Sequence, residues 1–223
     1  MTRSPRKSHP PGGSLEKSSA ELLRHGLLEL ALDVSEATRA ALLRYLDLLL
    51  RWNKTYNLTA VRDPTEMVTK HLLDSLSVVV HVSPGRILDV GSGAGLPALP
   101  LALARPELRV TALDSNQKKA RFINQVVLEL HIQNLLVVHR RVEDYQPTDC
   151  YDTVISRAFS SIPDFISATD HLLAPRGVWL AMKGIRPDAE LVTLPLGCRC
   201  QEVIPLRVPG LEAERHLVVL APV

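Results

Sequence analysis

The segment "ILDVGSGAGLPALPLALA" contains three glycines at alternate positions, Gly91, Gly93 and Gly95. They stand between an apolar run and a segment whose apolar residues have helical spacing. Glycine lets the backbone turn tightly and approach a ligand, and the helix that follows presents free N–H groups. Asp114 ends the next apolar run, where a carboxylate can accept hydrogen bonds from both hydroxyls of a ribose. The pattern therefore predicts a site for a ligand that contains ribose. An alternative role for Asp114 is a helix N-cap, and the two roles are compatible.

The residues around the loop favour a ligand without phosphates. Dinucleotide sites typically have the spacing GxGxxG, because the pyrophosphate sits on the N-terminus of the helix, whereas the spacing here is GxGxG. Pro97 and Pro100 remove amide donors from the first helical turns. Asp89, immediately before the loop, can order the turn or meet a cationic group of the ligand. S-adenosylmethionine fits this description, which favours methyl transfer over hydride transfer.

The elements that must position these residues change character near residue 83. Residues 1–19 are rich in Ser, Pro, Gly and basic side chains, which predicts a disordered tail. Residues 20–82 form a predicted helical cap, with Ser35 as an N-cap and Pro64 in the first turn of a second helix. Residues 83–223 alternate between strand and helix patterns, which predicts an α/β, Rossmann-like domain with a mostly parallel seven-stranded sheet and helices on both faces. Strands are expected at 86–90, 109–114, 134–139, 151–157 and 177–184, with a closing hairpin at 198–210 and 214–223.

Composition limits the partners and the compartment. The 223 residues are 46% apolar and 22% charged, which is typical of a globular protein. No apolar stretch is long enough to span a bilayer, and the N-terminus lacks the apolar centre of a secretory signal, so we expect a cytoplasmic protein without a membrane partner. Three cysteines without a CxxC pair indicate neither a disulfide framework nor a metal site. The net charge of +2 neither demonstrates nor excludes a nucleic-acid partner.

Several further motifs occur in a fixed order. They are "RWNKTYNLTAVRDPTEMVTKHLLDSL" in the cap, "LDSNQKKARFI" after the second strand, "RVE" at 141–143, "SRAF" at 156–159 and "MKG" at 182–184. Together with the glycine loop, and over residues 43–185, they resemble the bacterial 16S ribosomal RNA guanine-N7 methyltransferases, also called glucose-inhibited division protein B. The resemblance implies the class I S-adenosylmethionine-dependent methyltransferase fold. Leu96, Ala98 and Lys119 replace the Phe, Gly and Arg that are common in the family, which affects the expected shape of the pocket rather than its chemistry.

The resemblance also implies the site residues. Gly91 and Leu96 would line the S-adenosylmethionine pocket, Asp114 would hold the ribose, and Val142 with Glu143 would meet the adenine. The expected cofactor-binding residues are Asp89, Gly91, Gly93, Gly95, Leu96, Asp114, Ser115, Val142, Glu143 and Arg157. The expected catalytic residues are Arg157, Lys118, Asn57 and His71.

The implied substrate is 16S ribosomal RNA, in the small ribosomal subunit or an assembly precursor, methylated at guanine N7 in the decoding-region loop (guanine 527 in standard ribosomal RNA numbering). The N7 atom carries an exposed lone pair and no proton, so direct in-line transfer needs positioning rather than a general base or a covalent intermediate. The sequence agrees with this chemistry, because no cysteine lies near the strand-end motifs except Cys150, just before its strand, and no Asn/Asp-Pro-Pro-aromatic tetrapeptide occurs. We expect a monomer.

Several side chains have structural alternatives. Arg157 could form a structural ion pair, Lys118 could be a solvated helix residue, and Phe159 could belong to the core instead of stacking on a base. His71 and Asp74, three apart on one helix, either face the cleft or cap local structure. Two aromatic residues are expected to pack between cap and sheet, namely Trp52 and Tyr56. A basic rim that guides RNA is hypothesised from charge clustering at Lys118, Lys119, Arg121, Arg140 and Arg141.

Three other functions remain open from the residues alone. The first is methyl transfer to a small molecule or a protein, which the short cap and the modest charge permit. The second is a nicotinamide-dependent oxidoreductase. The third is a non-catalytic RNA-binding or assembly protein, against which the intact glycine loop and Asp114 argue.

Overall fold

The computed structural model describes residues 13–157 and 159–223. Helix α1 begins at Gly13, so residues 13–19, predicted to belong to a disordered tail, are helical. Leu23 and Leu27 of this helix lie in the core, and the residues before them form its first turns. The remainder of the predicted tail, residues 1–12, lies outside the described residues.

The cap consists of helical segments whose ends follow capping chemistry. The Ser35 side chain accepts a hydrogen bond from the amide of Thr38, which confirms the predicted N-cap. The Asp63 carboxylate accepts bonds from the amides of Thr65 and Glu66, and Pro64 occupies the first turn as predicted. The segments are α1 (Gly13–Glu29), α2 (Glu36–Tyr56), α3 (Pro64–Met67), the π-helical η1 (Val68–Leu73), α4 (Asp74–Leu76) and the 3₁₀ turn η2 (Val79–His81).

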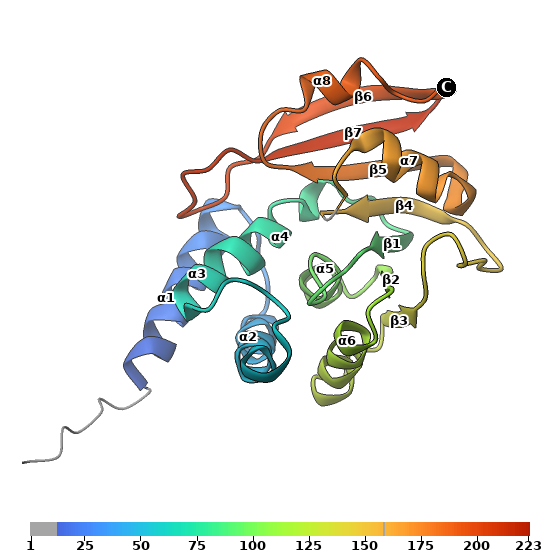
Figure 1. Ribbon diagram of the computed structural model, residues 1–223. Coiled ribbons are helices and arrows are strands. Elements are labelled where there is room, and N and C mark those ends of the chain that lie inside the picture. Colours follow the sequence, from blue (N-terminus) through green and yellow to red (C-terminus); the bar gives the residue numbers. More distant parts are fainter. Residues whose placement is uncertain (1–12, 158) are drawn as a thin grey trace, which may run out of the picture.

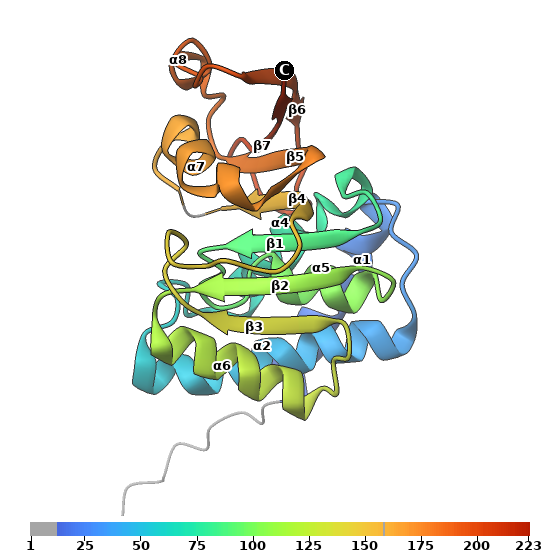
Figure 2. The same ribbon diagram turned by 90° about the vertical axis from the view of Figure 1, so that its right-hand side faces the viewer.

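Seven strands form one sheet in the order β3-β2-β1-β4-β5-β7-β6, which Figure 2 shows from one face. The pairs among β1 to β5 are parallel, and β7 runs antiparallel to both β5 and β6. The predicted mostly parallel sheet with a closing hairpin is therefore confirmed. The strands are β1 (Arg86–Val90), β2 (Arg109–Asp114), β3 (Leu135–His139), β4 (Tyr151–Ser156), β5 (Leu173–Lys183), β6 (Cys198–Pro205) and β7 (His216–Pro222).

Helices cover both faces of this sheet, as predicted (Figure 1). Side chains of successive strand residues alternate between the faces, so Ile87 joins the core under α2, α5 and α6, while Leu88 joins the core under α7. This double burial explains why the parallel strands have nearly continuous apolar sequences. The covering segments are α5 (Ala98–Ala104), α6 (Gln117–Glu129), α7 (Ile162–Thr169), the 3₁₀ turn η3 (Asp170–Leu172) and α8 (Asp188–Leu191).

Aromatic contacts attach the cap to the sheet domain. The Trp52 ring on α2 lies 5.6 Å from the ring of Phe122 on α6, between centroids, and Tyr45 packs on the same phenylalanine. The buried Tyr45 hydroxyl donates a 2.8 Å hydrogen bond to the carbonyl of Ala94 in the glycine loop. Trp52 therefore packs between cap and sheet as predicted, whereas Tyr56 stacks on Trp52 and stays 43% exposed. In the described parts of the chain, no helix has both the length and the apolar character needed to cross a membrane.

Candidate active site

The glycine loop leaves β1 and turns over the end of β2. The amides of Gly91 and Ser92 donate hydrogen bonds to the carbonyl of Leu113, at 2.9 and 3.1 Å. Gly95 has a φ of +88°, and a side chain there would place its Cβ 2.4 Å from a methyl carbon of Leu99. Backbone conformation and packing therefore both require glycine at position 95, and the predicted tight turn is confirmed.

Asp114 connects the loop to the helix that follows. Its Oδ2 accepts a hydrogen bond from the amide of Gly93 at 2.8 Å, and its Oδ1 accepts one from the amide of Asn116 at 2.7 Å. Asn116, and not Asp114, is the N-cap of α6, because the asparagine side chain accepts bonds from the amides of Lys118 and Lys119. Each oxygen of the Asp114 carboxylate retains further acceptor capacity, which a ligand hydroxyl can use.

A cleft of about 330 Å³ opens at the carboxyl ends of the central strands. In an open parallel sheet this is the place where ligands bind. Phe159 lines the cleft and also packs on Phe165, with ring centroids 5.2 Å apart, so its core and cleft roles coexist. Five predicted cofactor residues line this cleft, namely Gly91, Asp114, Ser115, Val142 and Glu143. Three cations of the predicted basic rim also line it, namely Lys119, Arg140 and Arg141.

A second hollow, of about 200 Å³, lies between the glycine loop and the cap. It shares Gly91 and Lys119 with the first cleft, so the two adjoin. The loop contributes Gly93 and Leu96, both predicted cofactor residues. The cap contributes Leu58, Thr59 and His71, and the end of β4 contributes Arg157.

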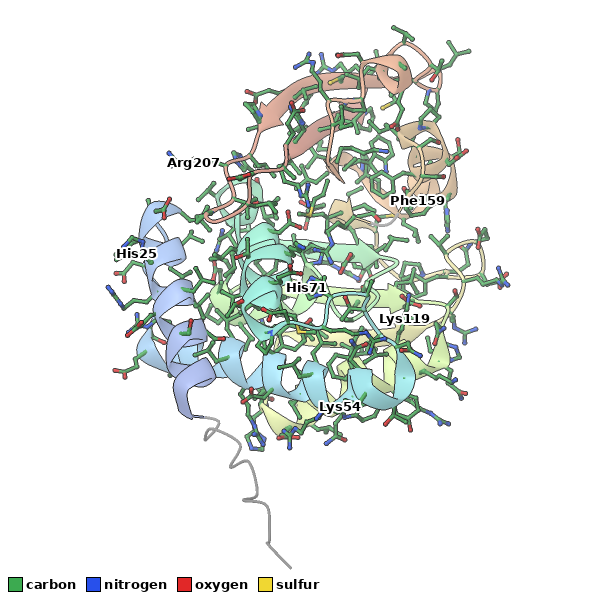
Figure 3. The ribbon with its side chains drawn as sticks, turned by 60° about the vertical axis from the view of Figure 1, so that its left-hand side comes forward. His25, Lys54, His71, Lys119, Phe159 and Arg207 are labelled. Carbon is green, nitrogen blue, oxygen red and sulfur yellow. The ribbon has the colours of Figure 1, made fainter. Side chains whose placement is uncertain are left out.

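His71 belongs to the π-helical segment η1, a kind of irregularity that often marks functional sites. Its Nε2 lies 2.9 Å from Oγ1 of Thr59, and the side chain of Asn53 fixes Thr59 through the threonine amide and carbonyl. Burial lowers the pKa of His71 to about 4, so the imidazole is uncharged near neutral pH. Figure 3 shows His71 between the cap and the sheet, with Lys119 and Phe159 toward the ends of the strands.

A third cavity, of about 420 Å³, lies on the other side of His71 and Arg157, both of which line it as well as the second hollow. Arg157 donates from Nη1 to the Asp74 carboxylate at 2.9 Å. Arg215 donates from Nε to the other Asp74 oxygen at 2.8 Å. The structural ion pair foreseen for Arg157 therefore exists, and the same side chain also lines two cavities.

Asp89 lies beneath the loop and lines none of the three cavities. Its Oδ2 accepts a hydrogen bond from the amide of Ala98, the first residue of α5, at 3.1 Å. Its Oδ1 is buried without a hydrogen-bond partner among the described residues. Burial raises the pKa of Asp89 to about 7. The carboxyl thus orders the turn, which is one of the two roles expected from the sequence.

Two expected catalytic residues lie outside the cavities. Lys118 is exposed. Lys119, the next residue, is rotated by about 100° around the axis of α6 and lines both the cleft and the second hollow. Asn57 is exposed at the end of α2 in a left-handed conformation, where its side chain accepts a bond from Arg62. The geometry therefore favours Lys119 over Lys118, and gives Asn57 a capping position.

Sequence reasoning did not find Thr59 and Arg215. Thr59 is part of the cap motif, but only the folded loop brings its hydroxyl to His71. Arg215 lies beyond the part of the chain that carried the family resemblance, and its partner Asp74 is 141 positions away. No local pattern indicates such a pair.

Comparisons with known proteins show the family of this chain. The family profile described as GidB, rRNA small subunit methyltransferase G, matches residues 38–218. A protein named ribosomal RNA small subunit methyltransferase G from Chromobacterium violaceum is 54% identical over 197 residues, covering 88% of this chain and 94% of that protein. The protein of the same name from Ectopseudomonas mendocina is 53% identical over 209 residues, covering 93% and 98%.

Solved structures support the fold. The glycopeptide N-methyltransferase MtfA, complexed with S-adenosyl-L-homocysteine, is similar with a TM-score of 0.59 at 12% identity, covering 69% of this chain and 87% of that one. TrmN from Thermus thermophilus is similar with a TM-score of 0.54 at 17% identity, covering 78% and 52%. The sheet order and these likenesses identify a class I methyltransferase fold. By the family profile and the relatives of more than half identity, this chain belongs to the ribosomal RNA small subunit methyltransferase G family.

Proposed function

We propose that this protein transfers a methyl group from S-adenosylmethionine to N7 of a guanine in 16S ribosomal RNA. The observation that carries the proposal is a row of three cavities, in which each cavity adjoins the next. The first is lined by the glycine loop and Asp114, the second joins that loop to the cap, and the third is cationic. The name shared by relatives of more than half identity supports ribosomal RNA as the acceptor.

The residues present fit the cofactor. The Asp114 carboxylate would accept the ribose hydroxyls, and Val142 with Glu143 would meet the adenine at the far side of the same cleft. The second hollow, lined by Gly91, Gly93 and Leu96, would hold the methionine portion. A Cβ at Gly93 would have no atom closer than 3.8 Å, so the floor of the hollow is open where a ligand would lie.

When bound, S-adenosylmethionine supplies a sulfonium methyl group, which the lone pair of guanine N7 takes in line as the carbon–sulfur bond breaks. No proton has to be removed from N7, so the task of the chain is alignment. His71 and Arg157 line both the second hollow and the cationic cavity, so they border the point where donor and acceptor meet. His71 is neutral there and Arg157 is paired with Asp74, which limits repulsion of the positive charge that moves onto the guanine.

The substrate form and the compartment follow from the same proposal. A guanine within the small ribosomal subunit, or within a precursor, must be presented from a loop to reach the hollow, because N7 of a guanine in an A-form helix lies in the deep, narrow major groove. With ribosomal RNA as the acceptor, the compartment that we propose is the cytoplasm, and the working form that we propose is a monomer.

The test is transfer of a labelled methyl group from S-adenosylmethionine to small subunits that lack the modification. Strand cleavage specific for N7-methylguanine then maps the product. We expect one cut, in the decoding-region loop. Cofactor binding with turnover of a small acceptor and no label in RNA would support the small-molecule alternative. Absence of S-adenosylmethionine binding, with a thermal shift by NAD, would support the oxidoreductase.

A further inference from the structure

The cationic cavity of about 420 Å³ is the largest of the three and lies beyond the glycine loop. Four cations line it, whereas Asp74 is the one carboxylate among its lining residues. Its volume falls in the range of small-ligand pockets, about 300 to 1,000 Å³. Of the residues that line the cofactor cleft and the second hollow, Arg157 and His71 alone contribute to its wall. The four cations are Lys70, Arg157, Lys183 and Arg215.

Two of these cations form a fixed pair. The Asp74 side chain is 3% exposed, and its two oxygens are each bonded to a different arginine, Arg157 at 2.9 Å and Arg215 at 2.8 Å. A buried carboxylate is costly unless it is paired and hydrogen-bonded, so Asp74 orders both guanidinium groups. The arginines come from the end of β4 and the start of β7, and among the described residues Asp74 alone bonds to both.

The pair has donors left over. Arg157 uses Nη1 for Asp74 and for the carbonyl of Lys70. Arg215 uses Nε for Asp74 and Nη1 for the carbonyl of Glu214. Nη2 of each arginine has no protein partner within the described part of the chain, and the two side chains remain 28% and 26% exposed. Each guanidinium therefore retains N–H groups for an anion.

Lys183 differs from the pair, because its ammonium is already engaged. It bonds to Glu190 and to the carbonyl of Ser160, and its side chain is 14% exposed. It therefore holds the loop after β4 in place. Lys70 is also paired, with Glu66 at 2.9 Å. The two arginines therefore offer the better ligand site, because each keeps an Nη2 group without a protein partner among the described residues.

We propose that the Arg157–Arg215 pair binds a phosphodiester of the RNA strand beside the target guanine, with Asp74 as the positioning residue. The planar guanidinium fork matches a phosphate, and phosphate contacts set the register of a nucleic acid. Because Arg157 also lines the hollow for the methyl group, a phosphate held by the pair fixes the strand next to the point of transfer. This inference rests on the proposed function, since it assumes that RNA is the acceptor.

The first test compares Arg215→Gln with Arg199→Gln in the full-length protein saturated with S-adenosylhomocysteine. Arg199 is an exposed arginine at the opposite end of the β6–β7 hairpin, where it pairs with Ala221. We expect Arg215→Gln to weaken binding of 16S ribosomal RNA about tenfold, with unchanged cofactor affinity. The slope of the logarithm of the RNA binding constant against the logarithm of the salt concentration, here called the salt slope, should become smaller in magnitude by about one. The control should keep the wild-type slope.

The second test is Asp74→Asn, for which two explanations predict opposite signs. If only net charge matters, removing a carboxylate from a cationic cavity strengthens RNA binding. If Asp74 positions the arginines, RNA binding weakens and KM for RNA rises more than kcat falls. S-adenosylhomocysteine affinity and thermal unfolding report whether the variant is folded, and Arg215→Gln tests the phosphate site if it is not.

The outcomes separate this inference from the proposed function. Wild-type protein that binds S-adenosylhomocysteine but does not methylate ribosomal RNA would contradict the proposed function itself. Wild-type methylation together with identical salt slopes for Arg215→Gln and Arg199→Gln would overturn the phosphate site alone. Tighter RNA binding by folded Asp74→Asn would overturn the positioning role.

Discussion

The cofactor cleft and the cationic cavity share an edge of one sheet but are built differently. The cleft depends on short segments of chain, since Asp114 bonds to Gly93 and Asn116, 21 and 2 positions away. The cavity depends on Asp74, whose partners Arg157 and Arg215 are 83 and 141 positions away. The contacts of Asp114 therefore lie within one strand–helix–strand unit, whereas the cationic cavity requires the cap, the end of β4 and the start of β7 to come together.

The largest effect is expected in the cofactor cleft. Asp114→Ala removes a carboxylate that accepts two backbone bonds and, in our proposal, the ribose hydroxyls. Charged hydrogen bonds contribute about 1.5 to 3 kcal/mol each, so we expect S-adenosylhomocysteine affinity to fall about a thousandfold by calorimetry. The nearby exposed Asp144→Ala is the control and should bind normally. Equal affinities for the two variants would remove Asp114 from the cofactor site.

Two buried groups, Asp89 beneath the glycine loop and His71 in the cap, should change the stability of the protein with pH in opposite directions. Burial raises the pKa of Asp89 from 3.8 to about 7, so folded protein holds a proton that unfolded protein releases, and stability falls as pH rises from about 4 to 7. Burial lowers the pKa of His71 from 6.5 to about 4, so the unfolded state binds the extra proton and stability rises from pH 4 to 6.5.

Urea denaturation of the ligand-free protein measures both effects. We compare the unfolding free energy of Asp89→Asn with that of the wild type. The variant's value minus the wild-type value should increase by a few kcal/mol from about pH 4 to 7, because one pKa unit corresponds to about 1.4 kcal/mol. The same difference for His71→Gln should decrease. Parallel slopes for the two variants would refute the assignment of the two pKa shifts.

A smaller effect separates packing from backbone conformation in the glycine loop. Gly95 and Gly197 have similar φ values, +88° and +85°, but a Cβ at 95 meets Leu99 at 2.4 Å while a Cβ at 197 meets nothing within 4 Å. Gly197→Ala should cost about 1 kcal/mol from backbone strain alone, and Gly95→Ala about 2 to 3 kcal/mol, since overpacking is added. Thermal unfolding should rank the variants in that order, and equal melting temperatures would show that Leu99 moves freely.

The smallest effect concerns the contact between cap and loop. Tyr45→Phe leaves the buried Ala94 carbonyl without its 2.8 Å partner, which should cost about 1 to 2 kcal/mol. Tyr56→Phe, at an exposed position of the same helix, should be neutral. If Tyr45→Phe is as stable as Tyr56→Phe in denaturant, the hydroxyl does not fasten the cap to the loop.

The same contrast explains what the sequence could predict. Strand boundaries such as Arg86–Val90 and Arg109–Asp114, the Ser35 cap and the turn at Gly95 depend on neighbours within a few positions, and all were predicted. The choice between Lys118 and Lys119 depends on the rotation of α6 against the sheet, which charge clustering does not encode. The Asp74 pair depends on the order of strands β4 and β7, so no reading of local pattern finds it.

In our proposal, donor and acceptor meet where Arg157 and His71 line both the second hollow and the cationic cavity. The most direct test is the single-turnover rate of methyl transfer to unmodified small subunits by Arg157→Gln, with cofactor and RNA both saturating. Because binding is then complete, the rate reports alignment alone, and a small misplacement can cost about 100-fold. We predict a loss of that order. A wild-type rate would contradict it and place the transfer elsewhere.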